Sequence, residues 1–298
     1  MSKHSVKDLS ASVNARLLDR ARKNGEDNSY VLIRYGVERF LFRLAHSSYR
    51  DKLILKGAMS FHVWSELKHR QTLDADFLGF GDDDAVIIEQ MITEIIETDV
   101  ENDGLVFYPD TIRVRDIMEG GRYHGKRIHL LAKLGSSQIR LQIDIGFGDK
   151  VTPEAKIENF PVLLDMAVPK IRVYPKETVV AEKFEAIVKL GMLNSRMKDY
   201  FDLLFIADTY AFKYNLLHSA LLNTFENRNT EVPDEIPIGL SEEFANNTNV
   251  QWKGFLKRSG MDNLVDLMEV IERLGKFLLP LTRDNRSFSE WHPGGPWL

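Results

Sequence analysis

The sequence predicts an α+β fold, with a mixed β-sheet and flanking helices in the N-terminal half and a mostly helical C-terminal half. Apolar residues recur at helical spacing over residues 11–24 and 29–46, which predicts two amphipathic helices at the start. Strand-like runs then fill much of 53–147, and helical spacing returns after residue 177. At 298 residues the chain is long enough for one large or two medium domains.

The N-terminal half can be divided into elements in chain order. The dipeptide Asn24-Gly25 separates the first two helices, because glycine often ends a helix. The run 79–84 is rich in Gly and Asp, which predicts a loop that caps the helix after it. The other expected elements are strands at 53–55 and 73–78, a turn at Gly57, helices over 59–67 and 85–98, and several strands between 105 and 147.

The last of these strands shows the clearest alternation in the chain. Apolar and polar residues alternate over 138–145, which predicts a strand with one buried and one polar face. The apolar set is Ile139, Leu141, Ile143 and Ile145, and the polar set is Arg140, Gln142 and Asp144.

The C-terminal half is expected to be helical after a connector. Residues 149–176 contain four prolines, which favours an irregular segment. The tail from Ser287 contains two prolines and two tryptophans, so we expect it to pack on the body of the protein. The expected helices cover 177–191, 195–210, parts of 213–225 and 239–247, and 262–278.

Composition excludes several classes of protein. The chain has no cysteine, so it has neither a disulfide framework nor a thiolate zinc site. The N-terminus lacks the apolar block of a signal peptide, and no run of 18 apolar residues follows, so we expect a cytoplasmic protein without a membrane partner. A net charge of −5 argues against a protein that coats nucleic acid with its whole surface, but it leaves room for a local basic patch.

Two carboxylates on one strand are the most informative feature. Asp74 and Asp76 are two residues apart in an otherwise apolar strand, so both leave the same face. Such like charges repel unless a cation lies between them or one of them is protonated, and a divalent metal is the simplest resolution. Asp144, on the polar face of its strand, is the best third ligand. The alternatives are that the pair only solvates the outer face of an edge strand, and that Asp144 is a surface residue.

Residues around the acid pair are candidates for binding a nucleotide. Gly57 permits close approach of a phosphate to the backbone, although a plain strand-to-helix turn would also use glycine. Ser60 is either a hydroxyl donor to phosphate or a residue of the first helical turn. Arg70, which precedes the acids together with Thr72, either neutralises phosphate or pairs with an aspartate.

A lysine stands out in the C-terminal half. Lys183 falls within the apolar stripe of helix 177–191, so it either extends to solvent or points at an anion. Further on, Asp199 and Asp202 are three residues apart and share one helical face. Pairs of Arg196 with Asp199 and of Lys198 with Asp202 are the alternative to a functional role for this segment.

Taken together, these residues resemble the AbiEii family of nucleotidyltransferase toxins, in the DNA polymerase β-like nucleotidyltransferase superfamily. The resemblance covers most of the chain and implies that the mixed sheet is of the nucleotidyltransferase type. It rests on Ala15-Arg16-Leu17-Leu18, the helix 34–44, Leu55-Lys56-Gly57-Ala58, and the runs 70–76, 142–149, 177–183 and 194–202.

The resemblance implies a toxin of a toxin–antitoxin pair, linked to phage defence by abortive infection. Such an enzyme transfers a nucleoside monophosphate from an NTP, with Mg²⁺ or Mn²⁺, to an acceptor. Some characterised relatives modify the 3′ end of tRNA, and we expect an RNA acceptor of this kind here. A cognate antitoxin is the implied partner. The implied domains are a nucleotidyltransferase-like domain with N-terminal helices over 1–165 and a helical domain over 166–298 that completes the active site.

Each candidate residue thereby receives an expected role. The superfamily usually has Gly-Ser or Gly-Gly where this chain has Gly57-Ala58, so a serine hydroxyl is lost there, and it is open whether Ser60 replaces it. The later motifs correspond to Lys183 and to Asp199 or Asp202. The expected catalytic residues are Asp74, Asp76, Asp144, Lys183, Asp199 and Asp202, with Asp74, Asp76 and Asp144 as metal ligands. The expected nucleotide-binding residues are Lys56, Gly57, Ala58, Ser60, Arg70, Thr72, Lys183, Arg196 and Lys198.

Two alternatives stay open at this point. The first keeps the chemistry but changes the acceptor to a protein or a small molecule. The second is a non-enzymatic protein that acts by binding an antitoxin. An RNA acceptor predicts a basic surface, for which the candidates are Lys189, Arg196, Lys198, Lys253, Lys257 and Arg258.

Overall fold

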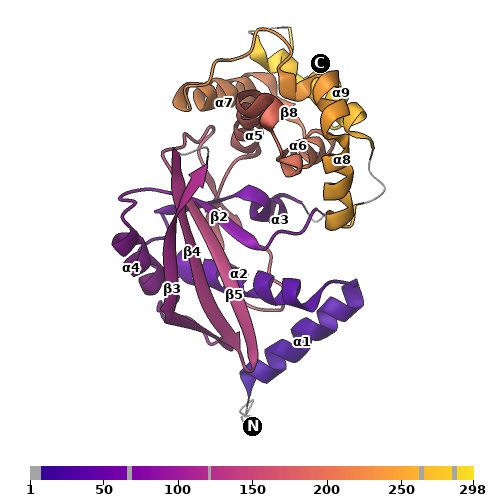
Figure 1. Ribbon diagram of the computed structural model, residues 1–298. Coiled ribbons are helices and arrows are strands. Elements are labelled where there is room, and N and C mark those ends of the chain that lie inside the picture. The colour runs from indigo at the N-terminus through magenta and orange to yellow at the C-terminus, as the bar shows by residue number, and fades with distance from the viewer. Residues whose placement is uncertain (1–7, 66–68, 120–121, 262–264, 284–286) are drawn as a thin grey trace. The chain divides into compact units, whose positions relative to one another are not determined.

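The computed structural model describes residues 8–65, 69–119, 122–261, 265–283 and 287–298, and it confirms the predicted α+β fold (Figure 1). The chain forms two compact units. The first unit comprises Met1–Leu67, Gln71–Gly148 and Lys156–Val173. The second comprises Lys68–Arg70, Asp149–Ala155 and Tyr174–Leu298.

A mixed sheet forms the centre of the first unit. Its described strands lie in the order β3-β4-β5-β2-β1-β7-β6. The pairs β2/β5 and β1/β7 are parallel, and the other neighbours are antiparallel. The strands are β1 Leu53–Lys56, β2 Asp74–Gly79, β3 Leu105–Glu119, β4 Arg122–Leu134, β5 Ser137–Phe147, β6 Lys156–Asn159 and β7 Lys170–Val173.

The helices of the first unit begin and end where the sequence provides caps. Side chains of Asp8, Asp27 and Asp84 accept hydrogen bonds from backbone N–H groups in the first turns of α1, α2 and α4. Gly25 ends α1 in the left-handed conformation, as predicted. The helices are α1 Leu9–Asn24, α2 Asn28–His46, α3 Phe61–Trp64 and α4 Ala85–Ile96, with the 3₁₀ turn η1 Gly57–Ser60 before α3.

The two faces of the sheet differ in character. The predicted apolar set of β5 is buried, and on this side α2 packs against β5 and α4 against β3. The other face carries the polar set of β5 and its cross-strand neighbours. Figure 1 shows β3, β4 and β5 as long strands that lie side by side. Because side chains alternate along each strand, the polar residues of this region gather on one face.

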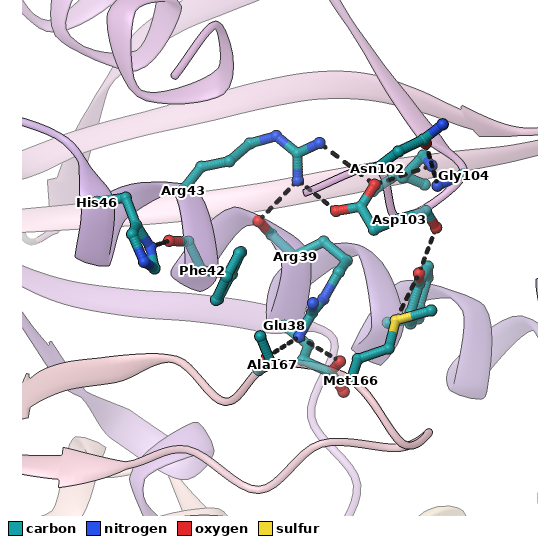
Figure 2. A network of polar contacts seen from close by, with 12 residues as sticks. Glu38, Arg39, Phe42, Arg43, His46, Asn102, Asp103, Gly104, Met166 and Ala167 are labelled. Carbon is teal, nitrogen blue, oxygen red and sulfur yellow. Dashed lines mark hydrogen bonds and ion pairs between the residues drawn. The ribbon is translucent and has the colours of Figure 1, made fainter. Parts of the chain in front are cut away.

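A polar network inside the first unit ties α2 to two loops (Figure 2). Arg43 donates to both carboxylate oxygens of Asp103, with Nη1–Oδ2 at 2.6 Å and Nη2–Oδ1 at 3.3 Å. Glu38 accepts a hydrogen bond of 2.7 Å from the backbone N–H of Leu163 and lies 2.8 Å from Arg39 Nη2. Burial raises the pKa of Glu38 to about 7 against the opposing effect of Arg39. This network belongs to the core, so we assign it to the stability of the fold.

The structure corrects two expectations in this unit. Residues 149–176 are not only a connector, because β6 and β7 lie within them and β7 pairs with β1 in the sheet. The apolar Ile171 and Val173 alternate along β7 and are buried, a signal that the neighbouring prolines obscure. The helix expected over 59–67 is also shorter, because its first residues form η1 and α3 ends at Trp64. Residues 66 and 67 lie outside the described residues.

The second unit is mostly helical, as predicted. Its tail packs on the body through Trp291 and Trp297, both buried, and Trp297 Nε1 donates to the carbonyl of Phe277 at 3.0 Å. Its elements are α5 Lys176–Leu190, η2 Gly191–Leu193, α6 Met197–Thr209, β8 Phe212–Lys213, α7 Tyr214–Asn227, η3 Ile238–Leu240, α8 Glu242–Ser259, α9 Leu267–Leu278, η4 Leu279–Thr282 and β9 Glu290–Trp291. Within the described ranges, no helix combines the length and the apolar character needed to cross a membrane.

One arginine fixes α5 within the second unit. Arg228 Nη2 lies 2.9 Å from Asp149 Oδ1 and 3.3 Å from Glu182 Oε2, and Nη1 lies 3.0 Å from Glu185 Oε2. Burial works to lower the pKa of Arg228, but the three carboxylates raise it above its ordinary value. Because two of these acids are on α5, the network restrains the helix that carries Lys183.

Candidate active site

The acid pair lies in the interior of the sheet. Asp74 and Asp76 are half-buried on β2, and Ala75 between them is fully buried on the opposite face. Since β2 pairs with β1 on one side and β5 on the other, it is not an edge strand. The alternative of two acids that solvate an edge strand is therefore wrong.

The strand register places four charged residues in a row across the sheet. Asp76 lies directly opposite Asp144 of β5 on one side and opposite Lys56 of β1 on the other. Asp144 in turn lies opposite Arg127 of β4. Directly paired residues point to the same face, so Lys56, Asp76, Asp144 and Arg127 form one line, which we call the charged row. Asp74 is on the same face, two residues from Asp76.

Arg127 is a member of this row that the sequence analysis missed. Its Nε and Nη2 donate to the two carboxylate oxygens of Asp144, at 2.9 and 2.6 Å. This hydrogen bonding raises the pKa of Arg127 against desolvation, and the charges of Asp144, Asp74 and Asp76 add to the rise. A bidentate pair of this kind fixes the direction of the Asp144 carboxylate. Asp144 is thus held within a charged site and is not a mere surface residue.

Gly57 supports the row from the end of β1. Its φ is +65°, and a Cβ at this position would lie 2.0 Å from Asp76 Oδ2. Only glycine therefore fits beside this carboxylate. The hydroxyl of Ser60 is buried and donates to the carbonyl of Gly57 at 2.6 Å, and Ala58 is also buried. In this arrangement Ser60 closes the turn, and its role in place of the lost hydroxyl at position 58 stays a prediction.

The aspartates of the charged row have the ligand type that a divalent cation such as Mg²⁺ or Mn²⁺ requires, and metal binding by them stays a prediction. Such ions prefer carboxylate oxygens, and Asp76 and Asp144 present these from adjacent strands. Because Gly57 has no Cβ, the Asp76 carboxylate can lie directly against the backbone at the end of β1. Among the described residues, no group of three or more His, Cys, Asp or Glu side chains is arranged to hold a metal. Asp144 would therefore join Asp74 and Asp76 as a ligand only where Arg127 releases it.

A second cluster lies within the second unit, around Asp202. This carboxylate is fully buried, and Arg70 donates to both of its oxygens, with Nε–Oδ1 at 2.7 Å and Nη2–Oδ2 at 2.8 Å. Lys183 Nζ lies 2.9 Å from Oδ2, and His69 Nε2 lies 3.1 Å from Oδ1. Burial favours a raised pKa, but Lys183 and Arg70 hold the pKa of Asp202 well below its ordinary value.

Lys183 points at anions, which is one of the two predicted outcomes. Its Nζ donates to Asp199 Oδ1 at 2.5 Å as well as contacting Asp202. Burial works to lower the pKa of Lys183, but the two aspartates outweigh it and raise the pKa. Arg70 likewise follows the second of its predicted alternatives, because it pairs with an aspartate. Two carboxylates and two cations balance here, and the assignment of catalytic roles to them stays a prediction.

The remaining candidates are placed as follows. Lys198 is exposed on α6 and does not pair with Asp202, because the partners of Asp202 are His69, Arg70 and Lys183. Thr72 is half-buried just before β2, and Arg196 is half-buried at the start of α6. His69, which also contacts Asp202, carries no local sequence signal except its position beside Arg70.

The chain is similar to a known protein family and to two solved structures. The family model described as "Nucleotidyl transferase AbiEii toxin, Type IV TA system" matches residues 39–273, which confirms the resemblance. No curated protein matches the chain. Among solved structures, JHP933 from Helicobacter pylori is similar at 16% identity and a TM-score of 0.47, covering 82% of this chain and 88% of that one. A putative nucleotidyltransferase from H. pylori is similar at 16% identity and the same TM-score, covering 82% and 91%.

Proposed function

Because the chain belongs to the AbiEii family of nucleotidyl transferase toxins of type IV toxin–antitoxin systems, we propose that it transfers a nucleoside monophosphate from an NTP to an RNA acceptor. The expected acceptor site is the 3′ end of tRNA. The observation that carries this proposal is the charged row, in which Asp76 and Asp144 lie directly opposite each other on adjacent parallel strands. Carboxylates on adjacent strands are the ligands that metal-assisted phosphoryl transfer uses, and this supports the proposal.

In the proposed reaction, the oxygen of an RNA 3′-hydroxyl attacks the α-phosphorus of the NTP. A new phosphorus–oxygen bond forms, and the bond from the α-phosphorus to the oxygen that bridges to the β-phosphate breaks. Pyrophosphate leaves with that electron pair, and the hydroxyl proton passes to a carboxylate of the row or to solvent. In such reactions the protein mainly positions the groups and stabilises charge.

The charged row, Asp74 and Gly57 each have a proposed part in this step. Asp74 and Asp76 would hold Mg²⁺ or Mn²⁺, with Asp144 as a third ligand. When bound there, the metal supplies positive charge that stabilises the phosphate oxygens as pyrophosphate leaves. Gly57 allows the Asp76 carboxylate to lie against the backbone, where any side chain would collide with it. Lys56 and Arg127, at the two ends of the charged row, would neutralise phosphate charge.

The family also implies a partner. Type IV toxin–antitoxin systems pair a toxin with an antitoxin, so an antitoxin partner follows from membership in the family. We propose further that the system acts in phage defence by abortive infection. This part of the proposal rests on the family alone.

The test is an incubation of the protein with each α-labelled NTP, Mg²⁺ and total cellular RNA, followed by gel separation. We expect label in a band of tRNA size, and we expect Asp74→Ala to abolish both this label and any growth inhibition. Full toxicity of Asp74→Ala, expressed at the wild-type level, would contradict the enzymatic proposal. Label in the protein itself would replace RNA by a protein acceptor.

A further inference from the structure

The face of the sheet that carries the charged row continues into a set of basic side chains. Cross-strand pairs point to one face, and the register links Arg115 to Arg127 and Asp144, and Arg113 to His129 and Gln142. Arg140 on β5 and Lys133 on β4 share this face through their own pairs with Leu131 and Gln138. We call this set the basic face; its members are Arg113, Arg115, Arg127, His129, Lys133 and Arg140.

Within the described part of the chain, several side chains of the basic face have no partner. Arg115, His129 and Arg140 are exposed, and among the described residues no hydrogen bond or ion pair involves their side chains. Arg113 is also exposed, but it donates to the backbone carbonyls of Asp110 and Ile112, at 3.0 and 2.7 Å. Among the residues whose side chains are described, no acid outside the charged row therefore pairs with the exposed arginines of the basic face.

Acidic residues in the same strands are directed elsewhere. Asp116 is on the opposite face of β3, where Lys126 Nζ lies 2.6 Å from its Oδ1. Asp110 lies in the irregular stretch where the β3/β4 register shifts. Asp116 therefore does not lie on the basic face, and Asp110 lies outside the regular strand pairing.

The basic face extends further than a nucleotide can reach. Arg140 is four residues from Asp144 along β5, which corresponds to about 13 Å at the rise of a β-strand. Lys133 is six residues from Arg127 along β4, which corresponds to about 20 Å. A triphosphate held at the charged row would contact Arg127, whereas the more distant cations need a ligand that carries phosphates over a longer path.

An aromatic side chain accompanies these cations. Tyr108 lies on the same face, opposite Leu131, and Lys133 Nζ is 5.0 Å from the centre of its ring. Proteins that bind single-stranded nucleic acid combine cations that follow the backbone with aromatic rings on which bases stack. The basic face offers both on one surface.

We propose that the basic face binds the single-stranded 3′ segment of the RNA acceptor and leads its terminal hydroxyl to the charged row. This inference rests on the proposed function, because it assumes that the acid pair is where the 3′ end reacts. Charge complementarity favours a polyanion, and the position of the face next to Asp144 favours the acceptor over an acidic protein.

The basic residues suspected from the sequence are less suited to this part. Lys189 pairs with Glu185 at 3.4 Å, and Lys253 lies 3.8 Å from Asp266. Helix α8, which carries Lys253 and Lys257, also begins with Glu242 and Glu243. Local acids therefore offset much of that charge, which makes α8 a suitable control surface.

The experiment compares Arg115→Gln/Arg140→Gln with Lys253→Gln/Lys257→Gln, two double variants that each remove two exposed cations. Binding of a 5′-labelled single-stranded RNA is measured by fluorescence anisotropy without NTP, at salt concentrations from about 50 to about 200 mM. Circular dichroism and urea unfolding confirm that both variants are folded. For Arg115→Gln/Arg140→Gln we expect binding at least about 10-fold weaker and a salt slope lower by about 1.4, since single strands lose about 0.7 for each contact removed.

Four outcomes decide the matter. Loss of RNA binding in Arg115→Gln/Arg140→Gln alone supports the basic face as the acceptor site. Unchanged binding in this variant, or equal loss in the control, overturns it while leaving the proposed function intact. Weaker binding of labelled poly-glutamate, measured in the same anisotropy assay, together with unchanged RNA binding overturns it in favour of an acidic protein. A wild-type protein that binds RNA through this face but transfers no nucleotide supports the surface and overturns the proposed function.

Discussion

Replacement of Gly57 by alanine tests how closely the backbone of β1 supports the acid pair. Gly57 and Gly25 have nearly the same backbone conformation, with φ of +65° and +64°. A Cβ at Gly25 would meet nothing within 4 Å, whereas a Cβ at Gly57 would lie 2.0 Å from Asp76 Oδ2 and 2.7 Å from its Cγ. Gly25→Ala is therefore a matched control that adds the backbone strain without the collision.

The magnitudes follow from these contacts. The left-handed conformation costs a non-glycine residue about 1–2 kcal/mol, so both variants should lose about that much stability. Gly57→Ala should lose about 1–3 kcal/mol more, because an extra carbon is forced into occupied space. The Asp76 carboxylate must also move by about 1 Å, and a displacement of that size costs a catalytic site about 100-fold in rate.

The assay measures urea unfolding and nucleotide transfer on both variants and the wild type, at a temperature where all three are folded. We expect Gly25→Ala to keep its transfer rate and Gly57→Ala to lose it. If both variants were equally stable and equally active, the close contact between Gly57 and Asp76 would have no importance for the site, and the reasoning would be refuted.

Three further predictions concern charge. Asp202→Asn should lower the free energy of unfolding by about 3 kcal/mol, because it leaves buried cations without their partner; urea unfolding measures this, and a loss below about 1 kcal/mol would contradict the structural role of the cluster. Glu38→Gln should remove a pH dependence. The pKa of Glu38 rises from 4.5 to about 7 on folding, so the native state holds the proton more tightly, and the stability of the wild type relative to the variant should fall by about 3 kcal/mol as pH rises from about 4.5 to about 7; a flat difference would contradict the raised pKa. Arg127→Met should bind Mn²⁺ more tightly than the wild type in the absence of nucleotide, because it releases Asp144, and electron paramagnetic resonance of free Mn²⁺ would detect this; weaker binding would argue against Asp144 as a ligand.

Local patterns were sufficient to predict much of the first unit. Side-chain alternation alone predicts that Asp74 and Asp76 lie on the same face of β2. The same argument predicts that Asp144 lies on the polar face of β5. The stripes of α1 and α2 depend only on residues three and four apart. Such features are encoded within one element, so they can be predicted without knowledge of the fold.

Partners across elements could not be predicted in this way. Arg70 pairs with Asp202 over a sequence separation of 132 residues. No local pattern in either segment predicts this contact. The pairing of Arg127 with Asp144 depends on the β4/β5 register, which the sequence did not provide. Strand β7 was missed because prolines flank a run of only four residues.

The most direct test of nucleotide transfer at the charged row measures where the α-phosphate and the γ-phosphate of the NTP go. The wild type and Asp76→Asn, at equal folded fraction, are incubated with RNA, Mg²⁺ and either α-labelled or γ-labelled NTP. Nucleotide transfer at the charged row predicts α-label in RNA, γ-label in pyrophosphate, and a rate at least about 100-fold lower in Asp76→Asn. Appearance of γ-label in the RNA, or an undiminished rate in Asp76→Asn, would contradict it.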